Sequence, residues 1–486
     1  MTKKSILRLL QASLMCCLAV LFTACDDIFA SEDNPTPAYL SMSDKPVTLK
    51  AGDTYRRKAI SVTTAVVEYS SSKTDVATVD NEGLVTAKAE GTTTITATAT
   101  GYSSQNGKKI YQPASVSYVV TVTPATVPAT SLSIDATLRL DNVAQTLTPT
   151  VTPSDATIIW TSSDEAVATV DAEGKVTPVA KGKATITATS GDLSATSTVY
   201  VYDKIWNINT DGAANVGGGE FWLIEGNGSE IGNAITINAS STTTVTTVTL
   251  NGINITQQID CSGDANIILA DGSTNTVTVS TANKAGIKIG NGATTTLTIN
   301  GETAGTGTLT VQGGTRGAGI GTDCVTDNIL SGGNIVINGG TVTATGGNYG
   351  AGIGTGRSEC SPSGSSNNTC GNITINGGMV TATGGNYGAG IGTGLSVGPS
   401  ASNGCGNIAI GTGVTSVTAT KGTGSPNSIG KGENMLGTQT CGTITFGTAA
   451  VFDGSAWTPN PMVADTYGGL TLAISGGTWT LTPVAP

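Results

Sequence analysis

Short runs in which hydrophobic and polar residues alternate fill most of the chain after its first 38 residues. Ile95 and Ala97 alternate with threonines in residues 94–98, and Ile373 and Ile375 alternate with polar neighbours in the same way. A two-residue period places apolar side chains on one face of a β-strand. The runs are separated by Gly, Asn, Asp and Pro, which favour turns. The pattern therefore predicts an all-β protein built from many short strands.

The first half of the chain contains an internal repeat. Residues 69–98 align with residues 160–189 without a gap, at an offset of 91 positions. Both copies carry the run VATVD followed by a glycine, Gly83 or Gly174, where the turn between two strands favours a residue that accepts positive φ. Large aromatic residues open both copies, as a sandwich with one large inward side chain requires. We interpret the two copies as β-sandwiches.

The copies closely resemble the bacterial immunoglobulin-like domain of group 2, and the stretch WTSSDEAVATVDAEGKVTPVAKGKATITAT at residues 160–189 carries the resemblance. It implies Ig-like sandwiches over residues 39–123 and 129–202. Such domains serve as spacers and adhesin modules in bacterial surface proteins. The Thr- and Pro-rich segment 121–128 is stiff enough to extend a stalk. We expect a passive stalk in preference to direct ligand binding.

A second, glycine-rich repeat occupies residues 203–450. Residues 333–356 and 371–394 differ at two positions only, and weaker copies lie on either side of them. Repeats of this period indicate a solenoid in which each copy is stabilised by its neighbours. Each copy divides into three short strands joined by Gly and Asn corners. We predict a right-handed parallel β-helix, with residues 451–486 closing its open end.

The repeats resemble β-helix modules of bacterial surface proteins that are sometimes described as carbohydrate-binding. Inserts of variable sequence interrupt the copies at one phase and should project from one edge, where binding sites usually lie; they span about 323–332, 357–370 and 395–405. Beside them Arg316, Tyr349 and Tyr387 occupy matching positions in successive coils. Facing outward, they would form a row of flat side chains suited to stacking on sugar rings. The alternative is that both tyrosines only cover the corner of the coil.

Six cysteines lie in the glycine-rich half: Cys261, Cys324, Cys360, Cys370, Cys405 and Cys441. The last three each precede the glycine that starts a coil, so we expect them to form a column. An exported protein permits disulfides, and the candidates are Cys324, Cys360, Cys370, Cys405 and Cys441. Burial as small core residues is the alternative. Because no CxxC spacing is present, we expect no thiolate metal site, and we expect no cofactor.

Residues 1–25 have the features of a secretory leader. Basic residues open the segment, and the apolar run that follows is shorter than the ~20 residues that span a membrane. The end, Leu21-Phe22-Thr23-Ala24-Cys25, resembles the lipobox of bacterial lipoproteins, although Phe22 replaces the usual Leu. The resemblance implies a lipid on Cys25, followed by a tether at residues 26–38. A plain signal peptide is the alternative.

The aspartates at positions 26 and 27 resemble those of lipoproteins carried to the outer face of the outer membrane in some Gram-negative lineages. We therefore expect an outer-membrane protein that faces the cell exterior and meets the membrane only through its N-terminal lipid.

Composition excludes several classes of function. The chain has no histidine, which rules out Ser-His-Asp and Cys-His catalysis and imidazole zinc sites. A net charge of -11 argues against nucleic acid as a partner. Polysaccharide lyases and hydrolases on β-helices need clustered carboxylates and a basic residue. The candidates at the insert edge are few and without pattern, so we do not expect an enzyme; they are Asp323, Asp327, Glu359, Arg316 and Arg357.

The sequence thus favours a surface adhesin or glycan-binding lipoprotein, whose partner is an extracellular polysaccharide, a host glycan or a surface protein. A structural component of the cell surface without a soluble ligand, and a polysaccharide-cleaving enzyme, are the alternatives.

Overall fold

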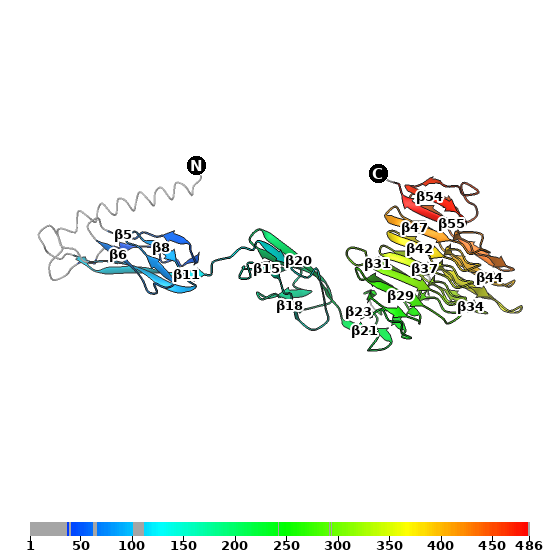
Figure 1. Ribbon diagram of the computed structural model, residues 1–486, viewed down its shortest axis with the longest axis horizontal. Coiled ribbons are helices and arrows are strands. Elements are labelled where there is room, and N and C mark those ends of the chain that lie inside the picture. The colour runs from blue at the N-terminus through cyan, green and yellow to red at the C-terminus, as the bar shows by residue number, and fades with distance from the viewer. Residues whose placement is uncertain are drawn as a thin grey trace. The chain divides into compact units, whose positions relative to one another are not determined.

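The computed structural model describes residues 36–37, 40–61, 66–100, 111–241, 243–290, 292 and 294–484. The leader, Cys25 and most of the tether lie outside the described residues. Every regular element described is a β-strand, from β1 (Thr36–Pro37) to β55 (Thr478–Pro483) (Figure 1), which confirms the all-β prediction. In this part of the chain no helix has the length and apolarity needed to cross a membrane.

The first sandwich follows the alternation of its strands. Its strands are β2 (Leu40–Ser41), β3 (Val47–Lys50), β4 (Thr54–Arg56), β5 (Ile60–Ser61), β6 (Val67–Ser71), β7 (Ala77–Val79), β8 (Leu84–Ala87), β9 (Gly91–Ala99), β10 (Tyr111–Gln112) and β11 (Ala114–Thr123). One sheet has the order β3-β11-β9-β6, and a second has the order β4-β8-β7. Ile95 and Val85 are fully buried, as are the other inward positions of β9.

The second sandwich repeats this arrangement. Its strands are β12 (Ser131–Ser133), β13 (Thr137–Leu140), β14 (Gln145–Thr146), β15 (Thr150–Thr152), β16 (Ile159–Ser162), β17 (Ala168–Val170), β18 (Lys175–Pro178), β19 (Gly182–Ser190) and β20 (Leu193–Val201). The sheet orders are β13-β20-β19-β16 and β14-β18-β17. Gly83 and Gly174 have φ of 73° and 80°. A Cβ on Gly174 would lie 2.8 Å from the Trp160 ring, so glycine is required both by the turn and by the packing.

Residues 204–452 form a parallel β-helix with three long sheets, whose outer surfaces we call the first, second and third faces. The first face contains β21 (Lys204–Asn207), β23 (Phe221–Glu225), β25 (Thr246–Asn251), β28 (Ala265–Leu269), β31 (Thr296–Gly301), β36 (Asn334–Ile337), β41 (Ile373–Ile375), β46 (Ile408–Ile410), β51 (Ile444–Phe446) and β52 (Ala449–Phe452), in that order.

The second face contains β22 (Ala214–Val216), β24 (Ile235–Ile237), β27 (Ile259–Cys261), β30 (Ile287–Lys288), β33 (Ile320–Gly321), β38 (Ile353–Gly354), β43 (Ile391–Gly392) and β48 (Ile429–Gly430). The third face contains β26 (Asn254–Ile255), β29 (Thr274–Thr278), β32 (Thr308–Gln312), β37 (Thr341–Thr345), β42 (Gly378–Thr383), β47 (Val414–Thr420), β55, β54 (Leu470–Ser475) and β53 (Asp465–Tyr467). Figure 1 shows β29, β37 and β42 in this order along the β-helix, and β32 lies between β29 and β37.

Successive coils stack with equivalent residues in register. Ile335 pairs with Ile373, which pairs with Ile408, and all three are fully buried. Each large aliphatic side chain buried in this way contributes roughly 1.5–3 kcal/mol. At the corners, Nδ2 of Asn376 donates to Oδ1 of Asn338 at 2.9 Å, and the amide ladder continues downward to Asn300. The interior is therefore an aliphatic stack, with a ladder of asparagine amides at one corner.

The second face contains a column of four glycines. Gly321, Gly354, Gly392 and Gly430 follow an inward isoleucine in four successive coils and have φ between 113° and 145°. A Cβ on Gly354 would overlap the carbonyl oxygen of Gly392 in the next coil. Glycine is therefore needed here both for its backbone conformation and for the close approach of neighbouring coils.

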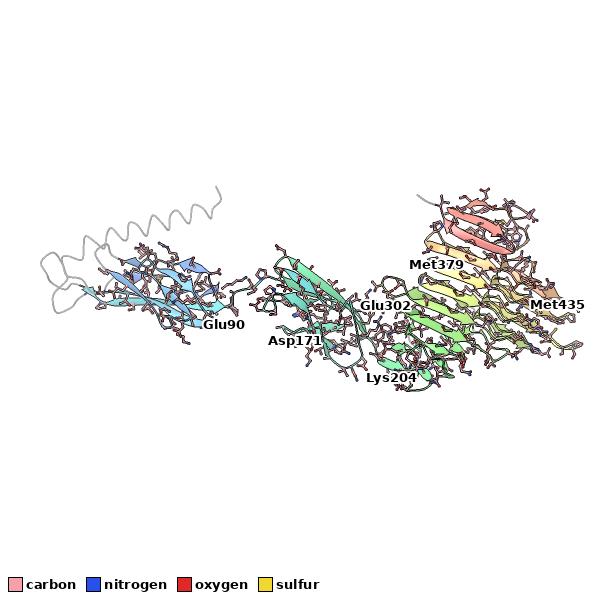
Figure 2. The ribbon with its side chains drawn as sticks, in the orientation of Figure 1. Glu90, Asp171, Lys204, Glu302, Met379 and Met435 are labelled. Atoms are coloured by element: carbon pink, nitrogen blue, oxygen red, sulfur yellow. The ribbon has the colours of Figure 1, made fainter. Side chains whose placement is uncertain are left out.

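The inserts are not independent loops, because they pair with one another from coil to coil. Their strands are β34 (Val325–Thr326), β39 (Ser358–Glu359), β44 (Ser396–Val397), β49 (Asn434–Met435), β35 (Ile329–Ser331), β40 (Ser366–Cys370), β45 (Ala401–Cys405) and β50 (Thr438–Cys441). They form two further sheets, in the orders β34-β39-β44-β49 and β35-β40-β45-β50. We call this part of the β-helix the insert lobe. Met435, labelled in Figure 2, lies at its outer edge.

Antiparallel strands cover the C-terminal end of the β-helix. Strand β52 pairs with β51, and β55 pairs with β47. The rings of Trp457 and Trp479 meet edge to face with centroids 5.1 Å apart, and Trp479 also contacts Phe446, which is fully buried. These aromatic side chains shield the last aliphatic residues of the stack from water.

Candidate ligand-binding edge

A column of two stacked tyrosines lies where the third face turns into the second face. Tyr349 follows β37 and Tyr387 follows β42, each after a Gly-Gly-Asn corner. Because the two coils are in register, the rings stack with centroids 5.6 Å apart and an interplanar angle of 11°. Both side chains are half-buried. The two tyrosines at the predicted positions therefore form a stacked pair, which we call the tyrosine column.

A charged group lies at the lower end of the tyrosine column. The guanidinium carbon of Arg357 lies 4.9 Å from the centroid of the Tyr349 ring, at cation–π distance. Arg357 also forms an ion pair with Glu359 at 2.9 Å, and Arg316 approaches the same carboxylate at 3.8 Å. Arg316 is the more exposed of the two arginines, with 38% of its side chain accessible against 12% for Arg357.

The upper end of the column meets backbone. A Cβ on Gly424 would lie 2.8 Å from the Tyr387 ring, so the next coil passes close to that ring. The ring faces thus contact Arg357, each other and Gly424. No described residue forms a hydrogen bond with either tyrosine hydroxyl. The column therefore offers ring edges, hydroxyls and the Arg316 guanidinium to a ligand, and the ring faces are in contact with protein.

The carboxylates of the insert edge each serve a structural contact. Asp323 accepts hydrogen bonds from Gln258 Nε2 at 2.6 Å and Ala285 N at 2.8 Å, and it pairs with Lys284 at 3.0 Å. Asp327 accepts from the backbone N–H of the insert that follows it in the next coil, at 2.7 Å. In the part of the chain that the structure describes, no three His, Cys, Asp or Glu side chains gather as a metal site requires. These carboxylates hold the insert lobe together.

Polar side chains inside the insert lobe position its strands. The buried amide of Asn368 donates to the carbonyl oxygen of Asp323 at 2.9 Å, and Asn403 donates to that of Leu395 at the same distance. Gln439 occupies the next step of this ladder. Sequence reasoning missed the ladder, although each of these residues stands two positions before a cysteine of the predicted column.

The cysteines stand as free thiols, and three of them form the predicted column. Cys370 pairs in register with Cys405, which pairs with Cys441. The Sγ atoms of Cys405 and Cys441 are 3.0 Å apart. Burial raises the pKa of Cys370 to about 12. Of the other candidates, Cys360 is buried and Cys324 is half-buried, where burial raises the pKa of its thiol.

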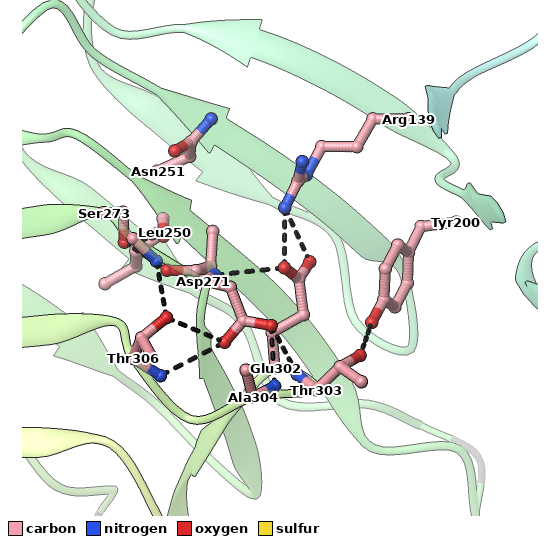
Figure 3. A network of polar contacts seen from close by, with 12 residues as sticks. Arg139, Tyr200, Leu250, Asn251, Asp271, Ser273, Glu302, Thr303, Ala304 and Thr306 are labelled. Carbon is pink, nitrogen blue, oxygen red and sulfur yellow. Dashed lines mark hydrogen bonds and ion pairs between the residues drawn. The ribbon is translucent and has the colours of Figure 1, made fainter. Parts of the chain in front are cut away.

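A polar network that local sequence does not reveal joins the second sandwich to the β-helix within one compact unit. Figure 3 shows Arg139 of β13 in contact with both carboxylate oxygens of Glu302, at 2.7 and 2.8 Å. The Tyr200 hydroxyl lies 2.8 Å from Thr303 Oγ1. Asp271 accepts hydrogen bonds from the N–H groups of Thr303 and Ala304 in the same loop.

Two family models agree with this architecture. Residues 39–110 and 119–201 match the bacterial Ig-like domain (group 2), and residues 335–357 and 373–395 match a β-helix repeat. Among solved structures, domains 1–6 of the surface layer protein SbsC align with 18% identity, 35% coverage of this chain, 28% coverage of that chain and a TM-score of 0.16. Domains EC1–4 of Drosophila N-cadherin align with 16% identity, 34% and 50% coverage and a TM-score of 0.17.

Three curated relatives share parts of the chain. Ice-binding protein 1 of Shewanella frigidimarina is 32% identical over 166 residues, which are 33% of this chain and 17% of that protein. An uncharacterised protein of Clostridium acetobutylicum is 36% identical over 143 residues, 28% of this chain and 14% of that protein. Lacto-N-biosidase of Bifidobacterium bifidum is 51% identical over 67 residues, 13% of this chain and 6% of that enzyme.

The chain therefore spans less than a fifth of the length of each of these relatives. Its own domains are two bacterial Ig-like domains of group 2 followed by a parallel β-helix with matching repeats, a combination typical of extracellular or cell-surface proteins.

Proposed function

We propose that this protein is a cell-surface lipoprotein that binds an extracellular polysaccharide or a host glycan at the tyrosine column. The observation that carries the proposal is the stack of Tyr349 and Tyr387 beside the insert lobe, with Arg316 exposed next to it. Rigid aromatic side chains bind at a low cost in conformational entropy because they have few rotatable bonds. The column places such groups on a stacked scaffold in which each coil supports the next.

The chemistry of the column suits a hydroxyl-rich ligand. Two phenol hydroxyls without a partner among the described residues can both donate and accept hydrogen bonds, and the Arg316 guanidinium donates several. The ring edges supply apolar contact to the C–H groups of a sugar. A glycan that follows the column would meet Arg316, Tyr349 and Tyr387 in three successive coils, so that weak contacts add along its length.

We further propose that the edge binds without cleaving its ligand. Glycosidic cleavage by two carboxyl groups requires them to flank the scissile bond on a free surface. Here Asp323 is bonded to Lys284 and Gln258, and Glu359 is bonded to Arg357. Neither carboxylate is available to protonate a leaving group or to activate water without breaking a contact that holds the insert lobe.

A glycan array tests the proposal. The purified protein should bind at least one class of glycan, and the Tyr349→Ala/Tyr387→Ala variant should lose that binding while circular dichroism shows that it remains folded. Met379→Ala provides a matched control, because Met379 is a large side chain, 44% exposed, on the third face. Equal binding by the double variant would remove the tyrosine column from the proposal. Release of reducing ends or unsaturated products would contradict the binding-only role.

The membrane anchor needs its own test, because Cys25 lies outside the described residues. We propose that Cys25 carries the lipid and that the two Ig-like domains form the stalk behind the β-helix on the outer face of the outer membrane. Cells that express the protein should incorporate labelled palmitate, and Cys25→Ala should abolish the label. Protease added to intact cells should digest the protein. Retention of the label in Cys25→Ala would overturn the anchor.

Capture of another surface protein is the second candidate function. The insert lobe exposes large apolar side chains at its outer edge, with Ile329 68% and Leu436 83% accessible. Apolar patches exposed at a surface mark protein interaction sites, and Met435, 40% exposed, adjoins Leu436 in the chain. Cross-linking on intact cells that is lost in an Ile329→Ser/Leu436→Ser variant, together with a negative glycan array, would favour this candidate.

A further inference from the structure

Two columns of outward-facing residues cross the third face at right angles to its strands. The first column is Thr276, Thr310, Thr343, Thr381, Thr418 and Thr480, and the second is Thr278, Gln312, Thr345, Thr383, Thr420 and Thr478. Eleven of these twelve positions are threonine, and the exception is Gln312. The C-terminal strand β55 extends both columns, although it runs antiparallel to β47. We call this surface the threonine face.

The threonine face is rigid and regular. Between the two columns, the intervening residues point inward and are fully buried in the coils, as Ala344 and Ala382 are, and the partly buried Trp479 takes this position in β55. Neighbouring strands lie about 4.8 Å apart, and alternate residues along a strand lie about 6.6 Å apart. Threonine is β-branched and has few χ1 choices. The result is a grid in which every position presents one methyl group and one hydroxyl.

The hydroxyls of the first column are available to a ligand. Within the described part of the chain, the side chains of Thr310, Thr343, Thr381 and Thr418 form no hydrogen bond. In the second column the hydroxyls of Thr420 and Thr478 contact each other at 2.9 Å, at the C-terminal end only. Hydroxyls exposed in this way bond to water in the free protein and can exchange that water for a polar ligand.

Coil stacking alone does not demand this repetition of threonine. The first face belongs to the same coils, and its equivalent outward column is Asn266, Thr298, Val336, Thr374, Ala409 and Thr445. A mixed column therefore satisfies the backbone pairing equally well. The repeated threonines of the third face are therefore not required by the stacking of coils. A surface that repeats one side chain at regular spacing suits a ligand that also repeats.

The charge and spacing of the face indicate the class of ligand. None of the twelve positions carries a charge, so the face offers nothing to an anionic polymer such as nucleic acid or an acidic glycan. The coil spacing of about 4.8 Å is close to the advance per sugar in an extended β-linked chain. A glycan lying along the columns would therefore place about one sugar over each coil, with hydroxyls against hydroxyls and C–H groups against methyls.

We propose that the threonine face binds an extended, uncharged, β-linked polysaccharide that lies along the two columns. This inference rests on the proposed function in taking a glycan as the ligand, but it uses a surface other than the tyrosine column. It names the ligand class as neutral and β-linked, and it requires several successive coils to act together.

Thr381→Glu and Thr374→Glu form a matched pair of variants. Both threonines are half-buried, lie in adjacent strands of one coil and are flanked by inward aliphatic residues, but Thr381 is on the threonine face and Thr374 is on the first face. The probes are cellulose particles, chitin particles and soluble mixed-linkage β-glucan, with polygalacturonate as the charged comparison. Binding is measured by sedimentation with the particles and by affinity electrophoresis with the soluble polymers.

We expect wild type and Thr381 variants to differ as follows. Wild type binds a neutral β-linked probe and not polygalacturonate, Thr374→Glu binds like wild type, and Thr381→Glu binds at least about tenfold more weakly. Thr381→Val keeps the shape of the side chain and removes its hydroxyl, and it should weaken binding by a smaller factor. Circular dichroism tests whether each variant is folded. If Thr381→Glu does not fold, the binding of Thr381→Val tests the threonine face instead.

Other outcomes overturn the inference in distinguishable ways. Equal binding by wild type and both Thr381 variants removes the threonine face and leaves the proposed function intact. Binding that Tyr349→Ala/Tyr387→Ala abolishes and Thr381→Glu does not assigns the glycan to the tyrosine column alone. Failure of wild type to bind any neutral β-linked probe overturns the inference, whatever the glycan array shows. Wild type that binds no glycan could still inhibit ice recrystallisation. If Thr381→Glu abolished that inhibition, the ligand of the threonine face would be ice and not a glycan.

Discussion

Arg139 on β13 contacts both carboxylate oxygens of Glu302, a residue 163 positions later in the chain whose side chain is only 2% exposed. This ion pair joins the second sandwich to a loop of the β-helix. A buried charge is costly unless it has a partner. The pair therefore holds β13 of the second sandwich against the loop of the β-helix that carries Glu302.

Arg139→Ala should weaken the contact between the second sandwich and the β-helix. It leaves the Glu302 carboxylate buried without its partner, a change that costs about 3–5 kcal/mol. We expect faster proteolysis near residue 203 and a lower first transition in thermal unfolding. Lys58→Ala is the control, because the Lys58–Glu82 pair has both side chains at least 60% exposed and should contribute less than about 1 kcal/mol. Identical proteolysis of Arg139→Ala and wild type would contradict a structural role for the pair.

Gly354→Ala should disrupt the stacking of coils. Its Cβ would overlap the carbonyl oxygen of Gly392, and Gly354 has φ of 136°. We expect a loss of at least about 3 kcal/mol in the free energy of unfolding, in the upper part of the range for single substitutions. Gly232→Ala serves as the control, since the nearest atom to its Cβ would be 3.9 Å away. Denaturant unfolding followed by circular dichroism measures both variants, and near-equal midpoints would contradict the close approach of coils.

Oxidation should join Cys405 to Cys441. Their Sγ atoms are 3.0 Å apart and neighbouring strands of one sheet hold them in register. Exchange with a disulfide donor in the export compartment would form one cystine and release two thiols from the donor. Closing this loop should stabilise the fold by about 3–4 kcal/mol through the unfolded state. Non-reducing peptide mass spectrometry of protein from its native compartment detects the bond. Full alkylation of both cysteines after unfolding without reductant would show that they remain thiols.

Acid should weaken the loop that carries Glu302. Burial of the Asp271 carboxyl raises its pKa, but hydrogen bonds from the N–H groups of Ala304, Thr303 and Thr306 outweigh this and lower the pKa below its ordinary value. A lowered folded-state pKa stabilises the protein above the unfolded pKa of about 3.9. That contribution is lost as pH falls through the folded-state pKa.

The Asp271→Asn variant should therefore be less stable than wild type at neutral pH and should lose less stability as the pH is lowered below about 4. Asp192→Asn is the control, because Asp192 is exposed and no described residue donates a hydrogen bond to it. Denaturant midpoints measured across the acid range give the comparison. Parallel pH profiles for Asp271→Asn and wild type would contradict the role of these hydrogen bonds.

Much of the fold was predictable because it repeats locally. The near-identical copies at residues 333–356 and 371–394 place Ile335 over Ile373 by inspection, and the structure confirms this pairing. Gly83 and Gly174 likewise mark their turns. A Cβ on Gly83 would overlap the carbonyl oxygen of Arg57, and a Cβ on Gly174 would lie 2.8 Å from the Trp160 ring. In both cases the residue types within a short segment are sufficient to determine the local geometry.

The strand pairing of the insert lobe was not predictable in the same way. Neither was the contact between the second sandwich and the β-helix. The inserts differ in length and sequence, so alternation does not reveal that β40 pairs with β45. Their alignment depends on buried amides such as Asn368 and Asn403, whose partners are backbone carbonyls. The Arg139–Glu302 pair joins segments that are far apart in the sequence, and neither a repeat nor an alternation of residue types indicates it. The prediction of Arg316, Tyr349 and Tyr387 placed equivalent positions correctly, but sequence could not show that the tyrosine rings cover each other.

The affinity of the protein for the glycan that binds it best on the array, measured by isothermal titration calorimetry, tests the central claim most directly. Our account predicts that Tyr349→Ala/Tyr387→Ala binds at least about tenfold more weakly while circular dichroism shows that it remains folded. Equal affinity in the two proteins, or no measurable binding of any glycan by wild type, would contradict it.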